Sequence, residues 1–219
     1  MAKKMGWTHL DNPFEYSFER GLYYHYITPL LVVGSQPRNA LDVDHLADEG
    51  VDVILNLQQD KDLAYWKVSL EEISGRAGHH GMQLVRTPAV DFSPHSLRDT
   101  LPKAVRALEQ ARACGQKVYV HCTAGLGRSP AVAIAALFWF SEGDGLSSLD
   151  EAYSFLTGIR PCGPSRDAIR GATYDLLSGR PHDHFQHEPS HAFATLSAHD
   201  RARIRSMLLG SSWATAAWP

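Results

Sequence analysis

The sequence predicts an α/β domain with a central, mostly parallel sheet flanked by helices, and three observations support this fold class. Short apolar runs of strand length alternate with longer segments of helical spacing along most of the chain. The run at residues 51–57 is almost continuously apolar, as a strand buried on both faces requires. The 219 residues are 44% hydrophobic and 21% charged, which suits a globular protein with a substantial core.

The expected elements follow in order along the chain. A strand at residues 30–33 precedes a helix at 41–48, which Gly50 stops. The strand at 51–57 leads into a polar loop at 58–62, and a helix is expected at 70–77. A strand at 83–86, a long helix at 97–113, a strand at 117–120 and a helix at 130–140 come next. Three more helices are expected at 149–156, 166–177 and 200–209.

The stretch between the strand at 117–120 and the helix that follows it carries the chemistry. Cys122 and Arg128 stand six positions apart there, with two glycines between them. In a strand–turn–helix unit, backbone N–H groups and the helix dipole converge on one point and bind an anion. A cysteine at the mouth of such a site becomes a nucleophile at neutral pH. The sequence therefore predicts phosphoryl transfer to Cys122, and the phosphate-binding loop is Thr123, Ala124, Gly125, Leu126, Gly127 and Arg128.

Other side chains near this loop have expected roles. Arg128 is expected to bind the phosphoryl oxygens with its planar guanidinium group. Asp91 is the predicted general acid, although an aspartate before Ser-Pro is also typical of a turn or a helix cap. Asp99, inside a predicted helix, is the alternative acid. Ser129 helps the thiolate to leave or caps the helix, and His121 orients the loop by hydrogen bonding.

Composition narrows the possible partners and compartments. A net charge of −3 does not indicate the excess of basic residues that nucleic-acid binding requires. No apolar run reaches membrane-spanning length. Three cysteines do not make a secreted disulfide framework. Five histidines between residues 182 and 199 fit no standard zinc spacing, so a solvated tail without metal or cofactor is expected. No transit peptide is visible.

Aromatic residues beside the expected anion site give a second clue. Tyr65 and Trp66 follow the polar loop, Phe92 adjoins the predicted acid, and Phe14 and Tyr16 lie in an N-terminal segment with weak secondary-structure signals. Pyranose rings present apolar faces that pack on aromatic rings, so these positions favour a sugar ligand. The alternative is that the rings anchor their loops to the core.

Several motifs resemble one known family. The run from His121 to Arg128 resembles the signature of cysteine-dependent dual-specificity phosphatases, and its inner residues are similar to the Cys-x-Ala-Gly-x-Gly-Arg form of glucan phosphatases. The plant starch-excess and like-starch-excess proteins have runs similar to residues 33–37, 55–62, 65–66, 91–92, 101–105, 160–164 and 168–176. The small like-starch-excess type without a carbohydrate-binding module matches best, over about residues 12–200.

The resemblance implies a dual-specificity phosphatase fold and a more specific function than phosphoryl transfer alone. It implies removal of phosphate monoesters from starch glucans (amylopectin, maltodextrin), with preference for the C3 position of glucose, during starch degradation at the granule surface in the chloroplast stroma. The three catalytic roles would fall on Cys122, Arg128 and Asp91. The aromatic residues named above would line a glucan channel. No nucleic acid or membrane partner is expected, and the protein would be a monomer.

The expected organisation has three parts. Residues 1–27 form an N-terminal recognition segment, 28–178 the phosphatase domain, and 179–219 a C-terminal segment that packs on the domain without a separate carbohydrate-binding module. Ser129 stands where plant glucan phosphatases usually have Ala, and Gln83 and Val85 stand where Arg and Met would form a remote glucan site. Asn56 replaces a cysteine that pairs with the nucleophile in the larger type, so that redox control is not expected. The two alternative functions are a protein dual-specificity phosphatase and a non-catalytic glucan-binding scaffold.

Overall fold

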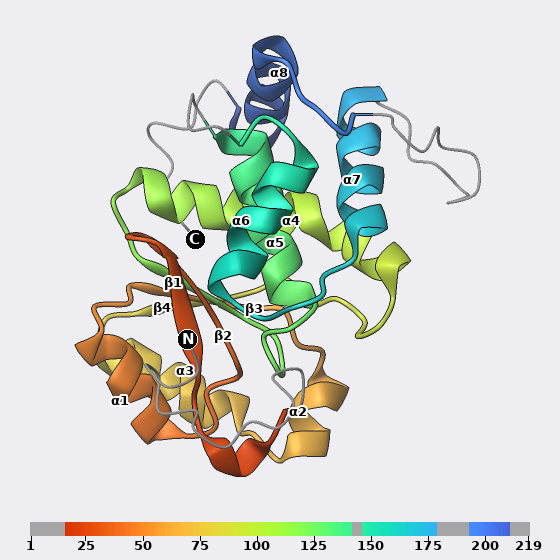
Figure 1. The fold of residues 1–219 in the computed structure, drawn as a ribbon. Helices are drawn as coiled ribbons and strands as arrows, with labels where there is room; N and C mark the ends of the chain where they lie inside the picture. The colour runs from red at the N-terminus through yellow and green to blue at the C-terminus, as the bar shows by residue number, and fades with distance from the viewer. Residues whose placement is uncertain (1–15, 142–145, 179–192, 211–219) are drawn as a thin grey trace.

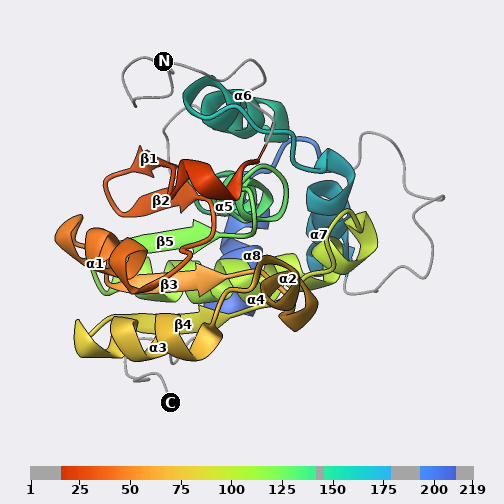
Figure 2. The ribbon, with the colours of Figure 1, turned by 90° about the horizontal axis from the view of Figure 1, so that it is seen from below.

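A five-stranded sheet with helices on both faces forms the centre of the molecule (Figure 1). The computed structural model describes residues 16–141, 146–178 and 193–210. The strand order is β1-β2-β5-β3-β4, which Figure 2 shows from top to bottom. β1 runs antiparallel to β2, and the other neighbouring strands are parallel, so the predicted mostly parallel sheet is confirmed. The strands are β1 (Tyr24–Thr28), β2 (Leu31–Gly34), β3 (Val53–Asn56), β4 (Gln83–Arg86) and β5 (Val118–His121).

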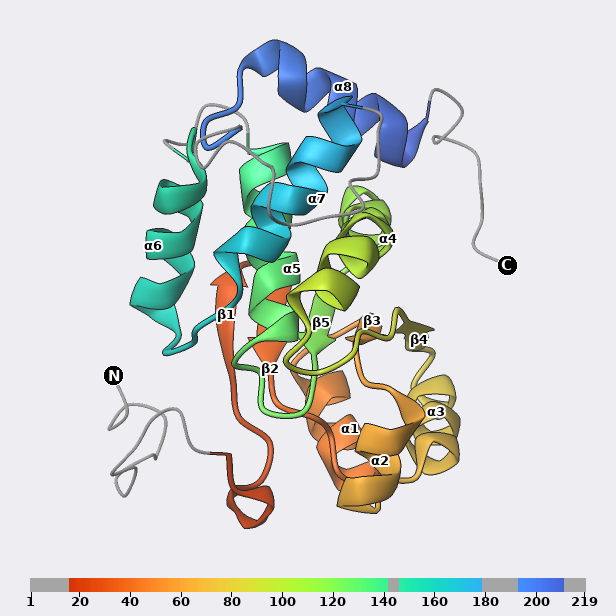
Figure 3. The same cartoon turned by 90° about the vertical axis from the view of Figure 1, so that its right-hand side faces the viewer.

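The helices divide into two groups on opposite faces of the sheet (Figure 3). One face carries α1 (Ala40–Asp48), α2 (Asp60–Trp66) and α3 (Leu70–His79). The other carries α4 (Pro94–Ala113), α5 (Arg128–Phe140), α6 (Leu149–Ile159), α7 (Arg166–Ser178) and α8 (Ala198–Leu209). A short 3-10 helix, η2 (Phe18–Arg20), precedes β1.

The central strands β2, β3 and β5 are buried along their whole length and largely apolar, because each contributes to two hydrophobic clusters. Successive side chains of a strand point to opposite faces of the sheet. In β5, Tyr119 therefore packs with the α1 and α3 side, whereas Val118 and Val120 pack with the α4–α8 side. Helix α5 is buried on all sides from Arg128 to Trp139, as expected for an apolar helix at the centre of a layer. The loop before α5 is thus joined to a helix that is almost entirely buried.

Three local features differ from the expectations. The predicted loop at residues 58–62 contains the start of α2, where the Asp62 carboxylate accepts a hydrogen bond from the Gln59 N–H at 3.0 Å. The consecutive polar residues conceal this helix start because they show no apolar period. Helix α4 begins at Pro94 and is capped by Ser93, whose Oγ accepts from Ser96 N at 3.2 Å. Strand β1 was not predicted, and it joins the sheet beside β2.

The described part of the C-terminal segment lies against the sheet domain. Thr195 forms a β-bridge with Ser148, and α8 packs on α4, α5 and α7 with Ile204 and Leu208 buried. His199 is in α8. Several residues singled out from the sequence lie outside the described ranges: Phe14, His182, His184, His187 and His191.

Candidate active site

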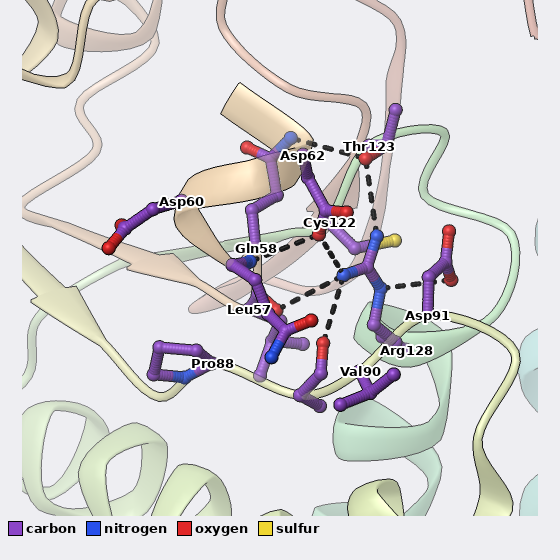
Figure 4. Close-up of polar contacts among 12 residues, drawn as sticks. Leu57, Gln58, Asp60, Asp62, Pro88, Val90, Asp91, Cys122, Thr123 and Arg128 are labelled. Atoms are coloured by element: carbon purple, nitrogen blue, oxygen red, sulfur yellow. Dashed lines mark hydrogen bonds and ion pairs between the residues drawn. The ribbon is translucent and has the colours of Figure 1, made fainter. Parts of the chain in front are cut away.

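Cys122 directly follows β5 and lies 3% exposed at the carboxyl edge of the sheet. The loop after β4 carries Asp91 to the same edge, because parallel strands end together (Figure 4). Ser129, in the first turn of α5, donates a hydrogen bond from its Oγ to Cys122 Sγ at 3.4 Å. Gly127 is the residue at the N-cap position, so the Ser129 hydroxyl is directed to the sulfur rather than to the helix end.

The carbonyls of five consecutive loop residues are all bound by groups outside the loop. His121 Nδ1 lies 3.0 Å from the Cys122 carbonyl oxygen. The other four carbonyls accept hydrogen bonds from donors on three separate segments: Gln36 N to Thr123 O at 2.9 Å, Tyr23 OH to Ala124 O at 2.7 Å, and, from the connection between α6 and α7, Arg160 Nε to Gly125 O at 2.8 Å and Gly163 N to Leu126 O at 3.0 Å. In a trans peptide the C=O and the next N–H point in opposite directions. Outward carbonyls therefore leave the N–H groups facing the space above Cys122, as an anion cradle requires.

Gly125 is required by this geometry. Its φ is +69°, a left-handed conformation that glycine adopts without strain. A Cβ at this position would lie 2.4 Å from the Gly34 carbonyl oxygen and 2.5 Å from an Arg160 nitrogen. The loop thus approaches β2 so closely that a side chain at residue 125 would push the cradle out of shape.

The electrostatics favour a thiolate at Cys122. Burial raises the pKa of the Cys122 thiol, but the charge of Arg128 and hydrogen bonds from Ser129 and from the Gly125 N–H lower that pKa, and the net pKa lies below the ordinary value. Burial lowers the pKa of His121 to about 4, so its ring is neutral at pH 7. His121 therefore lies where it can orient the loop, and it contributes no charge.

Arg128 is 3% exposed, and each of its three guanidinium nitrogens has a polar or ionic contact (Figure 4). Its NH1 donates to Asp62 Oδ2 at 2.5 Å and to the Ala89 carbonyl at 3.0 Å, and its NH2 donates to Thr123 Oγ1 at 3.2 Å. Its Nε lies 3.1 Å from Asp91 Oδ1. These partners fix the plane of a group that can bind two oxygens of a phosphate at once.

Asp62 is a site residue that sequence reasoning missed. It is 13% exposed at its side chain, lines the pocket above Cys122, and bonds both the start of α2 and Arg128. It therefore connects the helix that carries Tyr65 and Trp66 to the phosphate-binding arginine. No local pattern marks it, because 66 positions separate it from its partner.

The two candidate acids differ in position. Asp91 lines the pocket with its side chain 37% exposed. Asp99 lies on α4, 66% exposed, and its nearest ionic partner among the described residues is His95 at 3.7 Å. The structure therefore brings Asp91 and not Asp99 to the cysteine.

A cavity of about 770 Å³ opens above Cys122, and four of the five predicted sugar-binding aromatic residues line it. Tyr65 and Phe92 project from its rim, 77% and 97% exposed. Phe92 has φ +56°, an unusual conformation for a large side chain and one often found at functional sites. Tyr16 and Trp66 also line the cavity and form an aromatic wall, with ring centroids 5.0 Å apart in an edge-on contact.

Two further contacts support this aromatic wall, and sequence reasoning missed both. Phe18 stacks on Trp66 with ring centroids 5.8 Å apart and planes at 8°. The buried Gln36 donates to Tyr16 OH at 2.8 Å and accepts from Gln58 at 2.7 Å. Gln58 also donates to Thr123 Oγ1 at 3.1 Å, so hydrogen bonds run from the aromatic wall to the loop that follows Cys122.

The described residues hold no group of three or more His, Cys, Asp or Glu side chains arranged for a metal ion. No helix within the same ranges is long and apolar enough to cross a bilayer.

Comparison with known proteins agrees with this geometry. The family model "Dual specificity phosphatase, catalytic domain" matches residues 31–169. The chain is 41% identical over 166 residues to "Phosphoglucan phosphatase DSP4, amyloplastic" of Castanea sativa, which is 75% of this chain and 43% of the relative. It is 34% identical over 163 residues to "Phosphoglucan phosphatase LSF1, chloroplastic" of Arabidopsis thaliana, which is 74% of this chain and 27% of the relative. The chain thus spans less than half the length of these two relatives.

Solved structures give the same fold. The crystal structure of Tk-PTP in the active form is 28% identical, with a TM-score of 0.56 over 70% of this chain and 95% of that chain. The crystal structure of PTPMT1, at 24% identity and a TM-score of 0.55, covers 67% of this chain and 89% of that chain. The predicted fold class and the predicted family are both confirmed, and the chain belongs to the dual-specificity phosphatase catalytic-domain family.

Proposed function

We propose that this protein removes phosphate monoesters from starch glucans through a phosphocysteine intermediate. The observation that carries the proposal is the aromatic cavity directly above Cys122, lined by Tyr16, Tyr65, Trp66 and Phe92. Two relatives named as phosphoglucan phosphatases, at 41% and 34% identity, support the same substrate class.

In the first step the Cys122 thiolate attacks phosphorus and the bond from phosphorus to the sugar oxygen breaks. The leaving oxygen takes a proton from the carboxylic acid of Asp91, which lines the same cavity. The phosphoryl oxygens lie against the inward N–H groups of the loop and the guanidinium of Arg128, where negative charge is stabilised. The products of this step are a glucan hydroxyl, phosphocysteine and an Asp91 carboxylate.

In the second step water attacks the phosphocysteine. Asp91 accepts a proton from the water, and the sulfur leaves as a thiolate. The Ser129 hydroxyl, 3.4 Å from Sγ, stabilises that leaving thiolate. Inorganic phosphate is released and Asp91 is again protonated, so the cycle consumes one water for each ester.

The exposed aromatic residues of the cavity explain why a glucan suits this site. Tyr65 and Phe92 line the cavity and are largely exposed, and sugar rings pack their C–H faces on aromatic rings. A cavity of about 770 Å³ exceeds the space that one phosphate group needs, so several sugar units fit around the reacting one. Preference for the C3 position, a role in starch degradation at the granule surface, a plastid location and a monomeric state complete the proposal, and they rest on the family resemblance.

The test is phosphate release from solubilised phosphorylated amylopectin, measured beside an aryl phosphate and a phosphopeptide panel, with Cys122→Ser as the blank. We expect strong release from amylopectin relative to the peptides. Release from peptides but not from amylopectin would make this a protein phosphatase. Binding of glucan without release from any substrate would make it a scaffold.

A further inference from the structure

Arg160 lies behind the phosphate-binding loop and has no role in the chemistry described above. It stands at the end of α6, 1% exposed. Its Nε donates to Gly125 O at 2.8 Å, its NH2 donates to Ala124 O at 3.2 Å, and its NH1 lies 3.1 Å from His25 Nδ1. Its guanidinium carbon is 5.1 Å from the centre of the Tyr23 ring.

All of these partners are neutral. Arginine is only a donor, so His25 Nδ1 accepts and the ring is in its neutral form. Burial and the nearby Arg160 charge lower the pKa of His25 to about 4, which agrees with that form. Burial raises the pKa of Tyr23 to about 12, so its phenol keeps its proton at neutral pH.

Three further titratable groups act on the charge of Arg160 among the described residues, and two of them are neutral. Burial raises the pKa of Tyr119 well above its ordinary value and that of Cys162 to about 11. The exception is Cys122, whose thiolate is favoured. A buried cation without a counter-charge is strongly unfavourable, so the cradle and its anion are what can compensate the charge of Arg160.

Two other buried arginines show how unusual this is. Arg98 is equally buried, 1% exposed, and bonds Asp175 through two nitrogens at 2.7 and 2.6 Å. Arg128 has the Asp62 carboxylate at 2.5 Å. Arg160 has no carboxylate within ion-pair distance in the described part of the chain.

The contacts of Arg160 also orient two peptide groups of the phosphate-binding loop. By binding Gly125 O, it turns the following peptide so that the Leu126 N–H faces the cradle. Together with Tyr23 it holds Ala124 O, which directs the Gly125 N–H to the sulfur of Cys122. Both peptides belong to the part of the loop where Gly125 leaves no room for a side chain.

We propose that Arg160 is a positioning residue whose donors hold the phosphate loop in its anion-binding form and whose unpaired charge stabilises the thiolate and the bound phosphoryl group from behind. The proposal rests on phosphatase chemistry at Cys122, but it does not depend on glucan being the substrate. It holds for any phosphate monoester that enters the cradle.

The test compares Arg160→Met with the matched control Arg98→Met, which removes an equally buried arginine away from the cradle. The pH dependence of iodoacetamide alkylation, followed by mass spectrometry on the Cys122 peptide, reports the thiolate. Calorimetry with tungstate reports the cradle. We expect Arg160→Met to raise the Cys122 pKa by about one unit and to weaken tungstate binding about ten-fold. Arg98→Met should change neither, even where it lowers the melting temperature.

Arg160→Lys keeps the proposal testable if Arg160→Met does not fold. Lysine preserves the charge, but one ammonium group cannot bond both carbonyls in the same fork. We expect a Cys122 pKa close to that of the wild type and tungstate binding weakened several-fold. A folded variant of either kind with unchanged tungstate affinity would overturn the positioning role. A Cys122 pKa that rises as much in Arg160→Lys as in Arg160→Met, or in neither, would overturn the electrostatic role. None of these readouts uses glucan, so their failure is separate from failure of the proposed substrate.

Discussion

The phosphate cradle and the aromatic rim lie around the same cavity but are built in opposite ways. In the cradle, Cys122 and Arg128 are each 3% exposed, and consecutive carbonyls are tied to surrounding elements. In the rim, Tyr65 and Phe92 are 77% and 97% exposed. Buried, fully bonded groups suit transition-state stabilisation, whereas exposed rings can be exchanged without disturbing the fold. The comparison teaches that the reaction and the choice of substrate reside in separable parts of this site.

The largest effect should come from the nucleophile. Cys122→Ser should reduce turnover of glucan phosphate and aryl phosphate alike by more than about 10⁴-fold, because a serine hydroxyl is not ionised at neutral pH. Glucan binding, measured by sedimentation with amylopectin, should persist because the rim is intact. Loss of binding in a folded variant would mean that the two regions are not separable.

The second-largest effect should distinguish glucan phosphate from aryl phosphate, because the two substrates have different leaving groups. Asp91→Asn should slow glucan phosphate hydrolysis by about 10²–10⁴-fold, because a sugar alkoxide cannot leave without a proton. An activated aryl phosphate needs less help and should lose far less rate. Asp99→Asn, on the exposed face of α4, is the matched control and should leave both rates unchanged. Equal losses on both substrates would remove Asp91 as the general acid.

Asp62 tests the connection between cradle and rim. Asp62→Asn should lower kcat/KM for both substrates by about 10- to 100-fold, because Arg128 loses a buried ionic partner and its orientation. The asparagine oxygen can still accept from Gln59 N, so α2 should remain. Asp60→Asn removes the same charge from the same helix at an 87% exposed position and should have no effect. A loss confined to glucan would instead place Asp62 in sugar recognition.

The smallest effect on activity is expected when a residue that supports the aromatic wall is removed. Phe18→Ala removes the ring stacked on Trp66 and should raise the KM for glucan about three-fold through a looser aromatic wall. The aryl phosphate constants should not change. Phe155→Ala, at an exposed aromatic residue on α6 outside the cavity, is the control. Equal changes in the two variants would speak against a role for the stack.

The same contrast explains how far the sequence could predict the structure. The cradle was predictable because Cys122, its loop and Arg128 are contiguous between a strand and a helix of clear pattern. The residues that hold the cradle were not predictable from pattern. Asp62 and Arg160 come from α2 and from the end of α6, and only the folded sheet brings them to the loop.

The sequence predicts those helices and strands whose buried residues recur at a regular spacing, and it does not predict those in which few residues are buried. The apolar strands and α5 were clear because both faces of the sheet are covered. The sequence predicts a loop at the start of α2 because polar residues occupy its first turn, and of its seven residues only Leu63 is buried. It predicts a later start for α4 because Ser93 and Pro94 indicate a turn, although a serine cap followed by proline is also typical of a helix start.

The separation of chemistry from substrate choice is tested most directly by removing both exposed rings at once. Initial rates of Tyr65→Ala/Phe92→Ala should be measured on phosphorylated amylopectin and on an aryl phosphate, beside Leu41→Ala, which is 74% exposed and outside the cavity. We predict that kcat/KM for amylopectin falls at least about 30-fold while the aryl phosphate value stays within about two-fold of wild type. A parallel fall on both substrates, or an unchanged amylopectin rate, would contradict the account.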